Sequence, residues 1–248
     1  MLSIMNSRPE ERYDWNILRK LWHVSGCLVI LILFYQWKEM RRPFNGADMM
    51  LVLGWLAATG AVGIDVLRFT SPKNKAALEK HPVYGRMLRS QEQYNFNAST
   101  YMVLASAVLV TLWRFGLCRD VTLMASIAVL GIADPAAAAG RRALSSRGAR
   151  SAKAFGLLAF VFAAVAVMWP LCRWQGVSLG FPRMVAMALL VGLLEANAGL
   201  AVRLLAPATE CLHAKVSAHA ADWLRRMYPD DNLLIPLAMA GLMELLVT

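Results

Sequence analysis

The sequence predicts an all-α fold, a polytopic membrane bundle of about seven transmembrane helices that forms one domain over residues 1–248. Apolar residues make up 58% of the chain and charged residues 17%, whereas a soluble domain usually carries about a quarter charged residues. The apolar residues also fall into unbroken blocks, the cleanest being 98–113, 121–139 and 154–172. Blocks of this length are typical of membrane spans.

Along the chain, these blocks predict the spans in order. The sixth is the least regular, because Glu195 and Asn197 interrupt its end and an apolar stretch continues to Leu205. Residues 1–20 are polar and charged, so we expect the first span to act as its own signal-anchor, without a cleavable signal peptide. The predicted spans cover residues 20–37, 47–67, 98–114, 119–139, 153–172, 182–199 and 232–247.

Basic residues are unevenly divided between the two faces that these spans define. Of the 26 lysines and arginines, 19 fall in the N-terminal tail and the second, fourth and sixth loops, and 7 on the other face. The positive-inside rule therefore predicts a cytoplasmic N-terminus. It also accounts for the net charge of +10 without a nucleic-acid partner. The compact size favours a bacterial inner membrane.

Two of the cytoplasmic loops mix apolar with charged residues. In the second loop, residues 70–97, Ser71-Pro72 precedes apolar residues scattered among charges. In the sixth, residues 206–231, Leu212, Val216 and Trp223 recur at helical spacing. Both patterns predict amphipathic helices that lie at the membrane interface.

The four cysteines are scattered through the chain. Without a Cys-x-x-Cys pair, they argue against a zinc site and against a disulfide scaffold. Cys118 and Cys172 share the predicted outer face, where a bridge or two unrelated thiols both fit.

Ionisable and polar residues gather at the cytoplasmic ends of the predicted spans. They are candidate site residues, because such groups are costly to bury, although long basic side chains can also snorkel to water. For Arg68 the pattern favours this anchoring role, and for Asp134 it does not. One cytoplasmic site that holds an anionic ligand with a divalent cation accounts for the clustering. Its candidate residues are Arg19, Lys20, His23, Asp65, Arg68, Asp134, Arg141, Arg142, Lys153, Glu195, Asp231 and Asn232.

Asp134 stands in the most distinctive motif. It follows a long apolar run and precedes Pro135, four alanines, Gly140 and the pair Arg141-Arg142. An acid, small residues that allow close backbone approach, and paired arginines resemble a cation-plus-phosphate site. Pro135 predicts that the helix is broken at this point.

Six segments, taken in chain order, resemble one family. They are Arg19-Lys20-Leu21-Trp22-His23-Val24-Ser25-Gly26, Asp65-Val66-Leu67-Arg68, Arg89-Ser90-Gln91-Glu92 with Ser99-Thr100-Tyr101, Asp134 to Arg141, Lys153-Ala154-Phe155-Gly156, and Asp231 to Pro236. This series resembles the CTP-dependent lipid kinases, the family of dolichol kinase, phytol kinase and the yeast-type diacylglycerol kinase, over nearly the whole chain. It departs from the family pattern at Ala98 and Ala133, where the family usually has glycine.

The resemblance implies transfer of the γ-phosphoryl group of CTP to a membrane lipid alcohol of the polyprenol, phytol or diacylglycerol type, with Mg²⁺. Asp134 would hold the metal, and Gly140, Arg141, Arg142 and Lys153 would belong to the nucleotide-phosphate region. Either Asp65 or Asp231 could accept the hydroxyl proton. The rest of the implied site comprises Arg19, Lys20, His23, Arg68, Arg89, Glu92, Glu195 and Asn232.

Two other functions remain open at this point. A CDP-diacylglycerol synthase-like cytidylyltransferase would also use CTP and a comparable run of acid, glycine and basic residues, but would release pyrophosphate. A transporter or scaffold would use the polar cluster as a binding pathway. Neither the lipid acceptor nor the oligomeric state follows from the sequence.

Overall fold

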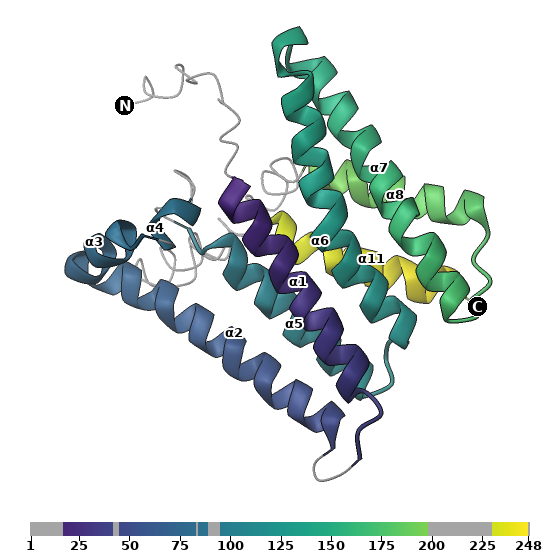
Figure 1. Ribbon diagram of the computed structural model, residues 1–248, viewed down its shortest axis with the longest axis horizontal. Helices are drawn as coiled ribbons and strands as arrows, with labels where there is room; N and C mark the ends of the chain where they lie inside the picture. The colour runs from purple at the N-terminus through teal and green to yellow at the C-terminus, as the bar shows by residue number, and fades with distance from the viewer. Residues whose placement is uncertain (1–16, 42–44, 83, 89–94, 198–229, 248) are drawn as a thin grey trace, which may run out of the picture.

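The computed structural model describes residues 17–41, 45–82, 84–88, 95–197 and 230–247, which are helical and contain no strand (Figure 1). The predicted all-α fold is therefore confirmed over this part of the chain. Long helices occupy the positions of the predicted spans: α1 (Ile17–Trp37), α2 (Gly46–Thr70), α5 (Ala98–Arg114), α6 (Asp120–Ala143), α7 (Ala149–Trp174), α8 (Phe181–Ala196) and α11 (Asp231–Leu246).

Four of these helices, α1, α2, α6 and α7, are long and apolar enough to cross a membrane. Helix α5 is apolar but has 17 residues. Helices α8 and α11 have 16 residues each, which is about 24 Å of helix against a hydrocarbon core of about 30 Å. Large apolar side chains such as Leu21, Ile32 and Leu56 are exposed on α1 and α2, where a lipid bilayer would cover them.

The second loop, whose pattern predicts one short amphipathic helix, contains two short helices, α3 (Pro72–Lys80) and α4 (Tyr84–Met87). Ser71 caps α3, because its hydroxyl accepts a hydrogen bond from the N–H of Asn74. The amphipathic segment predicted over residues 206–231 lies almost entirely outside the described residues. Cys27, Cys118 and Cys172 are buried free thiols, and Cys211 lies outside the described part of the chain.

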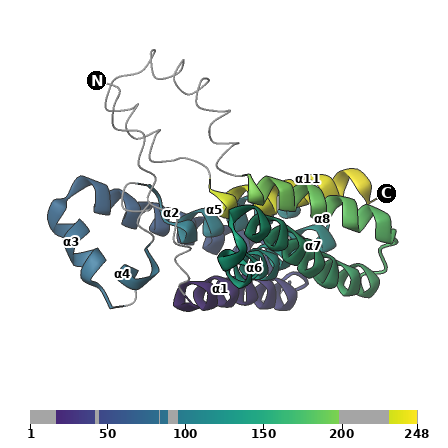
Figure 2. The same cartoon turned by 90° about the horizontal axis from the view of Figure 1, so that it is seen from above.

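Helix α6 forms the centre of the bundle. Of its 24 residues 15 are buried, whereas only 3 of the 21 residues of α1 are. It packs against α7, α1 and α11, and the view from above shows α1 and α11 on its two sides (Figure 2). Asp134, one of these buried residues of α6, is therefore surrounded by other helices.

Small residues bring α6 and α7 into close contact. A Cβ atom added at Gly140 would lie 2.9 Å from the backbone oxygen of Phe155 and from the Cβ of Ala159. One added at Gly156 would lie 2.6 Å from the Cγ of Arg141. Close approach of this kind is how helices associate within a membrane. Gly140 therefore contributes to helix packing in this structure.

The predicted break at Pro135 is wrong. Helix α6 continues through Pro135 to Ala143 and then passes through the short 3₁₀ turn Ser145–Arg147 into α7. Pro135 has no N–H to donate to the carbonyl of Gly131, but the next two turns pack on α7, and neighbouring helices make such a loss tolerable. Because the helix continues, Asp134 and Arg141, seven residues apart, lie on nearly the same face.

Enlarging Gly140 should separate α6 from α7. We expect Gly140→Leu to lower the free energy of unfolding in detergent by about 1–3 kcal/mol, because overpacking displaces backbone as well as side chains. Gly60→Leu is the matched control, since an added Cβ there meets nothing within 4 Å. Thermal unfolding should show that Gly140→Leu is less stable than Gly60→Leu. Equal stabilities of the two variants would contradict the close packing of α6 on α7.

Candidate functional site

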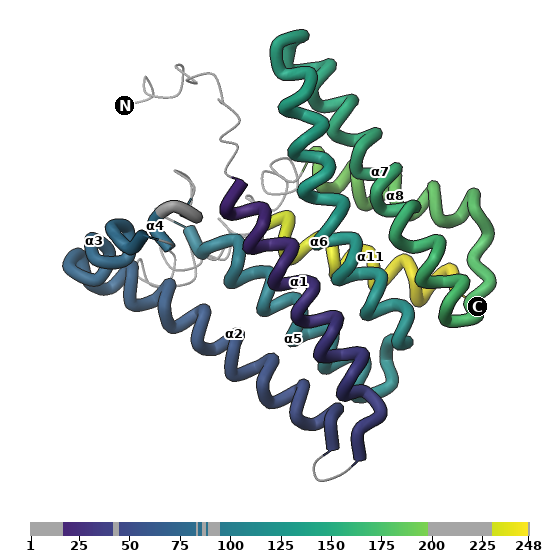
Figure 3. Tube along the Cα trace, in the orientation of Figure 1, coloured from purple at the N-terminus to yellow at the C-terminus, as the bar shows by residue number. Residues whose placement is uncertain are grey.

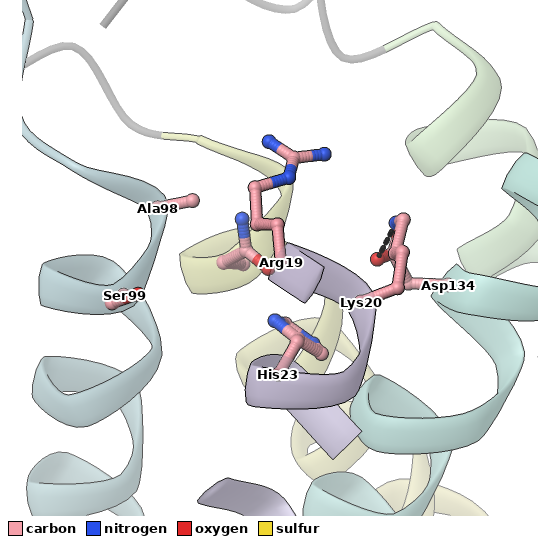
Figure 4. A pocket seen from close by; sticks show the side chains of 7 residues that line it. Arg19, Lys20, His23, Ala98, Ser99 and Asp134 are labelled. Atoms are coloured by element: carbon pink, nitrogen blue, oxygen red, sulfur yellow. Dashed lines mark hydrogen bonds and ion pairs between the residues drawn. The ribbon is translucent and has the colours of Figure 1, made fainter. Parts of the chain in front are cut away.

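A small polar pocket lies where the first turns of α1, α5 and α11 meet α6 at Asp134, within the length of that helix. Figure 4 shows the side chains of α1 that line this pocket between Ala98 and Ser99 of α5 and Asp134 of α6. The pocket brings together residues that are far apart in the sequence. Its lining residues are Arg19, Lys20, His23, Ala98, Ser99, Asp134 and Asn232.

Asp134 and Lys20 form a buried ion pair between α6 and α1. The Nζ of Lys20 lies 2.8 Å from the Oδ2 of Asp134, and the side chains are 12% and 4% exposed. A carboxylate this deeply buried would be costly to ionise without a positive partner. Lys20 therefore stabilises the charged form of Asp134 on the most buried helix of the bundle.

His23 lies one turn after Lys20 and is also buried. Its Nε2 lies 3.2 Å from the backbone oxygen of Leu130. A carbonyl oxygen can only accept, so Nε2 carries the proton in this hydrogen bond. The hydrogen bond fixes the ring of His23 against α6 at the wall of the polar pocket.

Three carboxylates meet beside this pocket, and we call them the carboxylate cluster. One oxygen each of Asp134 on α6, Glu195 on α8 and Asp231 on α11 lies within 4.8 Å of the others. Glu195 receives a hydrogen bond of 2.6 Å from Arg141, and its side chain is 2% exposed. Its second oxygen, Oε2, is buried with no hydrogen-bond partner among the described residues. The cluster therefore has an oxygen available for a further ligand.

The N-terminus of α11 supports the cluster. Asp230 caps this helix, and its Oδ1 accepts a hydrogen bond from the N–H of Asp231. The buried side chain of Asn232 donates through Nδ2 to Asp230 and to Asp231, at 2.9 Å in both cases. The positive end of the helix dipole also favours negative charge here. These interactions hold Asp231 beside Asp134 and Glu195.

Asp65 belongs to a separate buried network. Its Oδ2 accepts hydrogen bonds from the N–H of Asn97 at 2.9 Å and from the hydroxyl of Thr100 at 2.7 Å. Its Oδ1 lies 2.8 Å from Arg68 and accepts from the hydroxyl of Tyr84. Burial, together with the charge of Asp65, raises the pKa of Tyr84 to about 12, so the phenol stays a neutral donor. Asp65 thereby joins α2 and α4 to the start of α5.

Arg68 completes this network at the end of α2. Its side chain is fully buried, and it donates a hydrogen bond of 2.6 Å to the backbone oxygen of Asn95. The guanidinium also lies over the ring of Phe69. The sequence pattern favoured an interfacial anchor at Arg68. The structure corrects this interpretation, because Arg68 is a buried partner of Asp65.

Three other predicted site residues, Arg142, Lys153 and Gly140, do not line the polar pocket. Arg142 and Lys153 are exposed near the turn that joins α6 to α7, and Gly140 is buried between these two helices. Arg89 and Glu92 lie outside the described residues. Sequence reasoning did not predict Asp230, although an aspartate just before an apolar helix is a typical N-cap signal.

Comparison of the chain with protein-family models, with curated proteins and with solved structures finds no match. The class that the structure defines is an all-helical protein with several helices suited to a membrane and a buried acidic cluster at one end. Such a cluster, flanked by Lys20 and Arg141, can bind a cation through its oxygens and an anion through its basic groups.

Removing Asp65 should destabilise the fold far more than removing an exposed acid. We expect Asp65→Ala to lower the free energy of unfolding in detergent by about 3–5 kcal/mol, because Arg68 would be left as an uncompensated buried charge. Asp48→Ala breaks an exposed aspartate–arginine pair with Arg114 and should cost about 1 kcal/mol or less.

The double variant Asp65→Ala/Arg68→Leu separates the pair from the rest of the network. Denaturant titration should show that it recovers part of the lost stability, since no lone charge remains. A single variant as stable as Asp48→Ala would contradict the buried network.

Proposed function

We propose that the protein is a magnesium-dependent phosphotransferase that uses CTP to phosphorylate the hydroxyl group of a membrane lipid. The carboxylate cluster, formed at one end of a bundle of apolar helices, is the observation that most supports this proposal. The resemblance of the six segments to CTP-dependent lipid kinases supports the choice of nucleotide and acceptor.

The cluster has the donors and the size that a Mg²⁺ site requires. Mg²⁺ prefers carboxylate oxygens at about 2.0–2.1 Å, so two of its ligands lie at most about 4.2 Å apart. The three oxygens of Asp134, Glu195 and Asp231, all within 4.8 Å of one another, are close to this spacing. The buried Oε2 of Glu195 would gain in the metal the partner that it lacks among the described residues. Mg²⁺ would offset charge on the phosphate oxygens during transfer.

Lys20 and Arg141 would bind the phosphates. Each of them now neutralises one acid of the cluster, Asp134 and Glu195 respectively. When a cation takes over these acids, both basic groups become available for phosphate oxygens, which suit guanidinium and ammonium groups. Arg19 lines the same pocket and adds a third positive group. Exposed Arg142 and Lys153 would attract the nucleotide from solution.

In the proposed reaction the lipid hydroxyl oxygen forms a bond to the γ-phosphorus of CTP, and the bond to the β-phosphate oxygen breaks. The products are a lipid phosphate and CDP, and the hydroxyl proton passes to a carboxylate. Asp231 suits this role better than Asp65. Both oxygens of Asp65 already accept hydrogen bonds, whereas the hydrogen bonds to Asp231 from the described residues go to Oδ1 alone. One oxygen of Asp231 would then contact the metal, and the other would accept the proton. His23, held at the pocket wall by its hydrogen bond from Nε2, would orient the lipid hydroxyl by accepting a hydrogen bond at Nδ1.

We further propose how the helices are arranged in the membrane. All seven long helices would cross or enter the bilayer, with the N-terminus and the polar pocket on the cytoplasmic side of a bacterial inner membrane. The excess of basic residues on that side, 19 against 7, supports this orientation.

Asp134→Asn should abolish the reaction. We expect the rate of CTP-dependent lipid phosphorylation to fall by about 100-fold or more, because a metal that stabilises the transferring group contributes several kcal/mol. The measurement offers purified protein labelled CTP or ATP with polyprenol, phytol and diacylglycerol, and identifies both products. Release of CDP indicates a kinase, whereas pyrophosphate indicates a cytidylyltransferase.

Asp120→Asn is the matched control for this variant. Asp120 is the first residue of α6, and it also pairs with a lysine, Lys38, at 2.7 Å. We expect it to keep near-normal activity. An Asp134→Asn protein that remained as active as Asp120→Asn would refute the assignment of Asp134 to the metal.

Labelling of introduced cysteines tests the membrane arrangement. In a variant without the native cysteines, cysteines at exposed Lys73 and Arg142 should react with a membrane-impermeant reagent from the cytoplasmic side. A cysteine at exposed Arg41, after α1, should react from the opposite side. Labelling of Lys73→Cys and Arg142→Cys from different sides would refute a single cytoplasmic site.

A further inference from the structure

An apolar groove of about 480 Å³ lies between α1, α2 and α5, beside the polar pocket. We call it the lateral groove. Its apolar walls come from all three helices, and exposed Trp22, Val29 and Ile64 lie among them. A groove lined in this way on the outer side of a membrane bundle faces hydrocarbon rather than water.

The lateral groove exists because α1 and α2 pack on different partners. Helix α1 packs mainly against α6, whereas α2 packs mainly against α5. The two helices lie close together at the short connection after Trp37 and diverge towards the polar pocket (Figure 3). Small residues, Ser25 and Gly26 on α1 and Ala61 on α2, line the space between them.

Polar groups line the lateral groove mainly where it meets the polar pocket. Tyr84, Asn97 and Thr100 lie at the end near the start of α5, and Ser99 lines both the groove and the polar pocket. The remainder of the lining is almost entirely apolar. This division matches an amphipathic ligand whose single polar end reaches the pocket while its chain stays in the groove.

The extent of the lateral groove corresponds to one leaflet. Along α1 it runs from Trp22 to Ile30, about 12 Å of helix, and half of a hydrocarbon core is about 15 Å thick. The groove therefore reaches from the end that carries the polar pocket to about the middle of the bilayer. A chain that occupies it comes from the leaflet on that side.

We infer that the lateral groove binds the hydrocarbon chain of the lipid alcohol and directs its hydroxyl past Ser99 into the polar pocket. This inference rests on the proposed function. At the floor of the groove, Met102 lies against Gly26, where an added Cβ would come within 2.8 Å of the methionine methyl carbon. A flexible methionine on the floor can adapt to chains of different shape.

Filling the groove should weaken binding of the lipid and leave binding of CTP unchanged. For Ala61→Phe we expect the KM for a long-chain polyprenol or dioleoylglycerol to rise about tenfold or more, with the KM for CTP unaltered. Thr59→Phe places the same ring two residues away and is the control, because Thr59 is exposed on another face of α2 and does not line the groove. Val103→Phe, from α5, gives an independent second variant.

A crosslinking experiment identifies the occupant without relying on activity. Benzoylphenylalanine at Val103, in phosphatidylcholine vesicles that contain dioleoylglycerol, should give adducts enriched in dioleoylglycerol over its share of the vesicle lipid. Adducts in that same proportion would overturn the inference, and so would adducts with a second copy or with another segment of this chain.

The two proposals fail separately. A wild-type protein that transfers phosphate, together with Ala61→Phe and Val103→Phe variants of unchanged lipid KM, would overturn the lateral groove and leave the kinase standing. A wild-type protein that phosphorylates no lipid alcohol would overturn the proposed function, and the crosslink would then decide whether the groove still takes a lipid chain.

Discussion

The charge of Asp134 constrains the rest of the structure. It lies on the most buried helix, where an ionised carboxylate requires a positive partner, and Lys20 of α1 supplies it. A second aspartate–lysine pair, Asp120 with Lys38, joins α6 to the other end of α1. Helix α1 is thus held along α6 at both ends. Helix α2 is left to pack on α5, and the lateral groove opens between α1 and α2.

The positions of the long helices could be predicted because hydrophobic length is a local property of the sequence. The span predicted over 98–114 coincides with α5, and other predicted ends differ by a few residues. The end of α6 was missed because Pro135 is a strong local signal for a break. Its outcome depends on contacts that the local sequence does not show, above all the packing of Gly140 against α7. Packing between helices thus determines whether α6 continues past Pro135.

The same limit applies to the candidate site. Alternating helix direction predicts which acids share an end of the bundle, and Asp134, Glu195 and Asp231 do meet there. It does not predict that Asp65, at the same end, joins a different network. That separation arises because the segment before α5 turns its backbone N–H at Asn97 towards Asp65. Such a contact depends on how α2 lies against α5, which no motif in the sequence states.

The two acidic sites differ in what they still require. Asp65 has Arg68 and three further donors, so its charge and its lone pairs are satisfied by the protein. In the carboxylate cluster, Lys20 neutralises Asp134 and Arg141 neutralises Glu195. Among the described residues, the third carboxylate, Asp231, has no basic partner, and the buried Oε2 of Glu195 has no hydrogen-bond partner. Three converging carboxylates repel one another at low dielectric. A divalent cation would relieve that repulsion and free both basic groups for an anion, which is why we propose this cluster as the site of binding chemistry.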